Sequence, residues 1–103
     1  MHKFYLLMLI LASACAQVQD NPIENMRNAR NLVATCAGCH GTEGRAAAGA
    51  SAMLLAGRPR ERLISQMKAF KEDKQSTSVM HLISKGYTDA QIESLATYLA
   101  AQK

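Results

Sequence analysis

Five consecutive residues, Cys36-Ala37-Gly38-Cys39-His40, carry the side chains of this sequence that are best suited to chemistry. Two cysteines three positions apart can form thioethers to the two vinyl groups along one edge of a haem. A histidine directly after the second cysteine can then place a ring nitrogen on the iron. C-x-x-C-H is the typical attachment sequence of haem c. The segment therefore predicts one covalent haem c bound by Cys36 and Cys39, with His40 as the proximal ligand of the iron.

Three other uses of these side chains fit less well. A thioredoxin-like dithiol expects a βαβ setting, and the sequence shows no strand pattern around the cysteines. A structural zinc ion needs four ligands, and only His81 follows the motif as a further candidate. A disulfide between Cys36 and Cys39 would leave His40 without a role.

The iron of such a haem needs a sixth ligand or stays open, and three methionines follow His40. Met67 falls on the apolar face of a predicted helix, where it serves as core filler. Met53 follows His40 by only 13 residues, in a glycine- and alanine-rich loop. Met80 comes after a full helix and a polar loop, which is enough chain to reach the opposite haem face. We expect Met80 to be the distal ligand, with His81 as the alternative.

The elements expected to position these ligands are all helical. No alternation typical of strands occurs, so the fold class is all-α. Ile23, Met26 and Val33 should share one face of the first helix. The expected elements are a helix over 22–35 capped by Asn21, an irregular loop over 38–57, a helix over 59–71, a helical turn over 79–85 ending at a left-handed Gly86, and a final helix after a capping box over 88–91.

Composition limits the core and the partners. A domain this small buries proportionally little surface, and a bound haem would supply the bulky apolar group that the chain lacks. A locally basic segment, 58–74, is either a solvated helix face or a docking patch for an acidic partner. Aromatic residues are too few, and too far from these charges, to indicate nucleic-acid binding.

Residues 1–16 have the pattern of a secretory signal peptide: a short positive start, an apolar run and small residues at the cut. Cleavage after Ala16 would leave 17–103 as a monohaem domain. Cleavage after Ala14 would instead expose Cys15, as at a bacterial lipoprotein site, and would anchor the protein through a lipidated cysteine. Both readings predict export to the periplasm.

The sequence resembles class I cytochromes c over nearly the whole mature chain. It looks most similar to the cytochrome c4 and c553 group and to the cytochrome subunit of flavocytochrome c sulfide dehydrogenase. The segments that carry the resemblance are Cys36–Gly44, Leu55–Gly57, Gln66–Met67 with Phe70–Lys71, Ser76–Met80, Ile83–Tyr87, and Leu95–Ala96 with Tyr98.

The resemblance implies a class I cytochrome c fold, with three to four helices wrapped around one haem and the first and last helices crossing over one haem edge. It also implies Met80 as the distal ligand. The family commonly has Gly-Pro after the haem motif, where this sequence has Gly49-Ala50. The acceptor for the second ring nitrogen of His40 is therefore left unassigned.

The expected function is periplasmic electron transfer through a His/Met-ligated haem c, without catalysis. The segment 76–87 is most similar to its counterpart in the sulfide dehydrogenase subunit. An FAD-containing sulfide dehydrogenase is therefore the expected electron donor. The alternative is a free soluble carrier that delivers electrons to a terminal oxidase or reductase. A gas sensor or peroxidase would require an open iron site.

Overall fold

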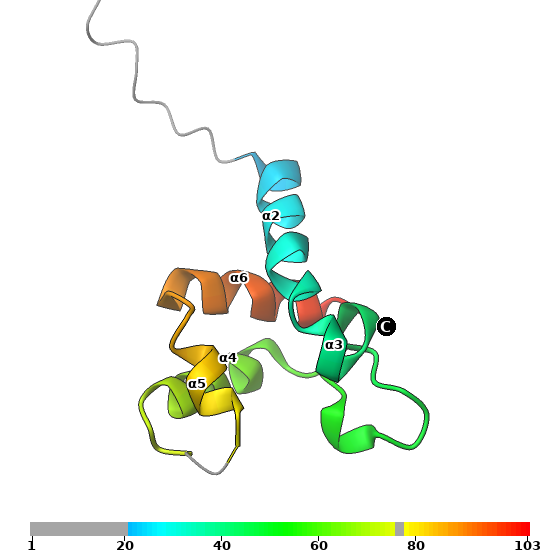
Figure 1. Cartoon of the computed structure of the whole chain (residues 1–103). Coiled ribbons are helices and arrows are strands. Elements are labelled where there is room, and N and C mark those ends of the chain that lie inside the picture. The colour runs from blue at the N-terminus through cyan, green and yellow to red at the C-terminus, as the bar shows by residue number, and fades with distance from the viewer. Residues whose placement is uncertain (1–20, 76–77) are drawn as a thin grey trace, which may run out of the picture.

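The structure is a computed structural model that describes residues 21–75 and 78–103. Its regular elements are all helical (Figure 1). The expected leader, 1–16, and Cys15 lie outside the described residues. No helix in the described part of the chain is long and apolar enough to cross a membrane. The elements are α2 (Pro22–Ala34), α3 (Ala37–His40), η2 (Thr42–Gly44), η3 (Ser51–Met53), α4 (Arg60–Lys71), α5 (Met80–Ser84) and α6 (Asp89–Ala100).

The two outer helices begin where their caps predict. The Asn21 side chain accepts a hydrogen bond from the Ile23 amide at 3.1 Å, and Pro22 takes the first helical position of α2. Thr88 and Gln91 form a reciprocal capping box at the start of α6. The two bonds measure 3.1 Å, from the Gln91 amide, and 2.9 Å, from the Thr88 amide. Local sequence therefore sets both starting points.

The core lies where α2, α4 and α6 pack together (Figure 1). Helix α6 supplies its centre, because it packs against both other helices. The buried side chains are Val33 from α2, Leu63 and Ile64 from α4, and Ile92, Leu95, Ala96 and Leu99 from α6. Ile23 and Met26, which are expected on the same face of α2 as Val33, are 71% and 66% exposed. Only the C-terminal half of α2 contributes buried side chains, Ala29 and Val33.

The loop after α3 is fastened to the C-terminal end of α6. The Gly44 carbonyl accepts hydrogen bonds from the Leu55 and Ala56 amides at 3.0 and 3.1 Å, and the Gly57 amide donates to the Leu99 carbonyl at 2.9 Å. Gly44 is buried at φ +74. A Cβ there would lie 2.7 Å from the Leu99 side chain. The loop can approach α6 this closely because residue 44 has no side chain.

We expect Gly44→Ala to destabilise the protein by about 2–5 kcal/mol. Left-handed backbone costs a non-glycine residue roughly 1–2 kcal/mol, and overpacking adds about 1–3 kcal/mol. Gly49→Ala is the matched control, because Gly49 also has positive φ, at +83, but a Cβ there meets nothing within 4 Å. Urea unfolding of the haem-loaded variants should show the larger loss at position 44. Equal losses would mean that the contact with Leu99 contributes nothing.

Candidate haem site

The two cysteines and the histidine of the motif lie on one short turn of helix. The chain passes from α2 through Thr35 into α3 with continuous hydrogen bonding. The Cys36 carbonyl accepts from the amides of Cys39 and His40 at 3.3 and 2.9 Å. Residues three apart on a helix face the same side, so both sulfurs can reach one edge of a planar group. Both are free thiols, with Cys36 half-buried and Cys39 exposed.

The environment of Cys36 favours a neutral thiol. Burial raises the pKa of the Cys36 thiol above its ordinary value, against a smaller lowering by the Thr35 hydroxyl. Thiolate is the form that binds zinc and that attacks disulfides. In the described part of the chain, no three His, Cys, Asp or Glu side chains gather in a way that could hold a metal ion. The structure therefore gives no support to the zinc reading.

A backbone carbonyl holds the His40 ring. It is the acceptor for the second ring nitrogen, which could not be assigned from the sequence. The ring Nδ1 lies 2.7 Å from the Met53 carbonyl oxygen. A carbonyl only accepts, so Nδ1 carries the proton and donates it to this bond. The other nitrogen, Nε2, then keeps its lone pair for a metal, and the ring cannot turn freely. This tautomer is the one that a proximal ligand needs.

Met53 and Met67 have structural roles. Met53 ends η3, and its carbonyl fixes the His40 ring. Met67 packs against the core, and its sulfur accepts a hydrogen bond from the buried Ser84 hydroxyl at 3.6 Å. The prediction that Met67 is core filler agrees with this contact.

Met80 is the first residue of α5 and is half-buried. Its amide donates a hydrogen bond to the Ser78 hydroxyl oxygen at 3.2 Å. The His81 ring lies against the backbone three residues earlier, with Nδ1 2.5 Å from the Ser78 carbonyl oxygen. Helices α3 and α5 lie on opposite sides of the lower half of Figure 1. They are not among the element pairs that pack closely. The expected iron ligands therefore belong to separate elements.

Exposed apolar side chains occur on both of these separate parts of the fold. Met53 and Leu54 are exposed after α3, and Val79, Leu82 and Ile83 are exposed around α5. Large uncovered aliphatic side chains are costly unless something apolar covers them. Two thiols, an imidazole with a fixed tautomer and a thioether form a donor set suited to haem c. The residues present therefore fit a covalently bound haem.

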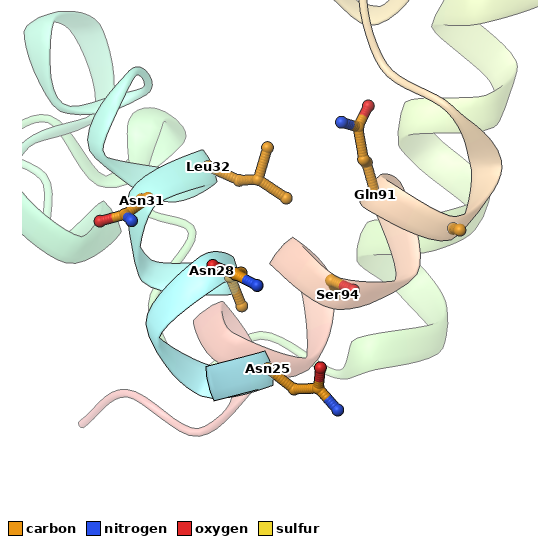
Figure 2. A pocket seen from close by; sticks show the side chains of 8 residues that line it. Asn25, Asn28, Asn31, Leu32, Gln91 and Ser94 are labelled. Carbon is orange, nitrogen blue, oxygen red and sulfur yellow. The ribbon is translucent and has the colours of Figure 1, made fainter. Parts of the chain in front are cut away.

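A surface groove of about 500 Å³ lies away from the motif, between α2 and α6 (Figure 2). None of its lining residues is charged. None of the residues that line it comes from α3 or α5, so it takes no part in the candidate haem site. The lining residues are Asn25, Asn28, Ala29, Asn31, Leu32, Ala90, Gln91 and Ser94.

Glu43 joins the loop after the motif to two helices. Its carboxylate accepts a hydrogen bond from the Tyr98 hydroxyl of α6 at 3.0 Å and one from the Arg45 guanidinium at 2.7 Å. Arg30 of α2 lies 3.9 Å away. The Tyr98 hydroxyl, and then Arg45, lower the pKa of the Glu43 carboxyl below its ordinary value. This role of Glu43 could not be predicted from the sequence, because Arg30 and Tyr98, its partners on the two helices, are distant along the chain.

Glu43→Gln should lower stability at neutral pH and change its dependence on acid. A carboxyl whose pKa is depressed in the folded state stabilises the protein above the ordinary pKa, and that contribution disappears as pH falls through the folded-state value. The difference in melting temperature between wild type and Glu43→Gln should therefore shrink below about pH 4.5. Glu61→Gln, which removes a single exposed ion pair, is the control. A Glu43→Gln difference that grows in acid would contradict the assignment.

Comparison with known proteins shows the family of this chain. The cytochrome c family model matches residues 26–103. A protein of Thiomonas intermedia (strain K12) named thiosulfate dehydrogenase electron acceptor is 34% identical over 70 residues, which are 68% of this chain and 32% of the relative. The chain thus spans about a third of the length of this curated relative.

Proposed function

The chain belongs to the cytochrome c family, and we propose that it is an exported carrier that receives electrons from an enzyme oxidising an inorganic sulfur compound. Members of this family bind haem c covalently, and the helical fold described here is theirs. The observation that carries the proposal is the His40 ring fixed by the Met53 carbonyl beside two free thiols. The signal-like segment 1–16 is the basis for export.

Each motif residue has one role in this proposal. Cys36 and Cys39 would form the thioethers, and His40 would bind the iron through Nε2. Met80 of α5 would be the second iron ligand from the protein. When bound, the haem supplies an iron that cycles between two oxidation states by one electron. A thioether ligand raises the reduction potential relative to a second histidine.

The protein's own contribution is to hold these ligands still. The hydrogen bond from His40 to Met53 keeps the proximal ring in one orientation in both oxidation states. Met67 and Ser84 anchor α5 to α4, which limits the movement of Met80. Fixed ligands reduce the rearrangement that accompanies electron gain or loss. No bound substrate is needed for this function.

Two kinds of electron donor follow from separate observations. The named relative accepts electrons from a thiosulfate dehydrogenase. The segment 76–87 instead resembles the cytochrome subunit of a flavoprotein sulfide dehydrogenase. Both donors oxidise inorganic sulfur compounds. The proposal therefore commits to this class, with the flavoprotein as the specific candidate.

The test is reduction of the purified, oxidised holoprotein. We expect sulfide with an FAD-containing sulfide dehydrogenase to reduce the haem at a rate proportional to enzyme concentration, measured by absorption. Thiosulfate with its dehydrogenase is the parallel reaction, and each sulfur compound without enzyme is the control. Reduction by the thiosulfate pair alone would remove the flavoprotein. Reduction by neither pair would overturn the proposal.

One observation favours a free carrier as the second candidate. In the described part of the chain, Arg58, Arg62 and Lys68 have no carboxylate within ion-pair distance, although Arg60 and Lys71 do. Unpaired cations along α4 can steer an acidic partner. Electron delivery to a terminal oxidase or reductase should then slow steeply with added salt. A rate that salt does not change would remove this candidate.

A further inference from the structure

One hydrogen bond joins the part of the chain that carries the haem motif to the part that carries Met80. The Tyr87 hydroxyl oxygen lies 2.7 Å from the Thr35 hydroxyl oxygen. Thr35 directly precedes Cys36, and its hydroxyl also lies 4.0 Å from the Cys36 sulfur. Among the described residues, we find no second hydrogen bond or ion pair between segments 35–57 and 78–87.

The direction of this hydrogen bond follows from the partners of Thr35. Its hydroxyl has one proton, which it donates to the Leu32 carbonyl at 2.8 Å. The Thr35 oxygen must then accept, so Tyr87 donates. Removing the Tyr87 hydroxyl would leave Thr35 with its own acceptor. Tyr87→Phe is therefore a clean deletion of one bond.

Both ends of this bond belong to rigid units. The Tyr87 amide donates to the Ser84 carbonyl at 3.2 Å, and the Gly86 amide donates to the Ile83 carbonyl at 3.0 Å, so Tyr87 continues the turns of α5. On the other side, the Cys36 amide donates to the Val33 carbonyl at 2.9 Å, which ties α3 to the end of α2. A bond between Tyr87 and Thr35 therefore fixes one unit relative to the other.

We propose that Tyr87 is a positioning residue that, through Thr35, keeps the segment bearing Met80 at the distance from the haem motif that iron ligation needs. This rests on the proposed function, in which Met80 is the distal ligand. Loss of the bond should free α5 to move away more often. The visible result is faster release of the distal ligand.

The test uses reduced holoprotein and carbon monoxide. At saturating carbon monoxide, the binding rate is limited by release of the distal ligand. We expect Tyr87→Phe to raise this rate by between about twofold and tenfold, which is the range for one neutral hydrogen bond. It should also lower the reduction potential, because a loosened thioether favours the reduced iron less.

Tyr98→Phe is the matched control. It also deletes one tyrosine hydroxyl bond, to Glu43, but that bond does not involve the Met80 segment. We expect its carbon monoxide rate and potential to equal those of wild type. In a Thr35→Val background, Tyr87→Phe should add no further acceleration, since its partner is already gone. Equal rates for Tyr87→Phe and wild type, or equal acceleration in Tyr98→Phe, would overturn the proposal.

Failure of the ligand assignment gives a different result. If Met80 does not bind the iron, wild type and Met80→Ala, both with Tyr87 intact, should take up carbon monoxide at the same rate. That result would overturn the assignment of Met80 and, with it, the role of Tyr87. A slow wild type, a fast Met80→Ala and an unchanged Tyr87→Phe would overturn the role of Tyr87 alone.

Discussion

A double variant, Cys36→Ser with Cys39→Ser, should yield a chain without covalently bound haem. Serine hydroxyls do not form the thioethers that this motif makes with haem vinyl groups. Any haem that still reaches the protein would be held only by ligation and burial, and acid denaturation would release it. The denatured variant should be colourless and lack the mass of the tetrapyrrole. The denatured wild type, made with haem-maturation machinery, should keep both.

Measuring the denatured chain makes this result independent of folding, which matters because the core is small. Without haem, the buried hydrophobic side chains are few, so we expect the variant to fold poorly. Cys15→Ser is the control, because Cys15 lies outside the motif and should leave the haem in place. A denatured double variant that keeps the colour and the mass of the haem would show that other residues hold the haem.

Met80→Ala should open the sixth coordination position of the iron. The reduced variant is expected to bind carbon monoxide completely at neutral pH within the mixing time, whereas the wild type should bind it slowly or not at all. Met67 cannot replace Met80 easily, because its sulfur accepts a hydrogen bond from Ser84 inside the fold. The absorption spectrum of the reduced protein with and without the gas is the measurement.

Met67→Leu and Met53→Leu are the matched controls for this experiment. Leucine keeps the volume of Met67, and Met53→Leu retains the main-chain carbonyl that orients His40. Met53→Leu should bind carbon monoxide as wild type does, whereas Met67→Leu, which loses the bond from Ser84, should bind it faster than wild type but far more slowly than Met80→Ala. If His81→Ala opens the site to carbon monoxide and Met80→Ala does not, the distal ligand is His81.

The helices were predictable because their signals are local. Asn21 with Pro22, and Thr88 with Gln91, specify their helix starts within four residues of sequence. The all-α class and the buried stripe of α6 follow from periodicity. The prediction that Gly86 has a left-handed backbone was wrong. Among the described glycines, positive φ occurs at Gly41, Gly44, Gly49 and Gly57. Helix α5 ends in ordinary helical backbone at Lys85, so Gly86 is not needed to turn the chain.

The long-range contacts of the fold were less predictable than the candidate ligands. The motif identifies Cys36, Cys39 and His40 as candidates from adjacent letters, and the placement of Met80 depends on counting residues. The contacts of Glu43 with Tyr98, and of Tyr87 with Thr35, join positions more than fifty residues apart. Such pairs depend on how helices pack, which one sequence does not reveal. The role of the Met53 carbonyl could not be predicted, because every residue has a backbone carbonyl and nothing in the sequence distinguishes this one.

The main-chain origin of that carbonyl affects how this position can evolve. Different apolar side chains can stand at residue 53 while its backbone oxygen still meets the His40 ring. Drift in amino-acid identity should therefore be tolerated there. The count of residues between 40 and 53 is what must be preserved, because an insertion or deletion would carry the oxygen away from the ring. Relatives of this protein should vary in which apolar residue stands at this position and hardly at all in the spacing.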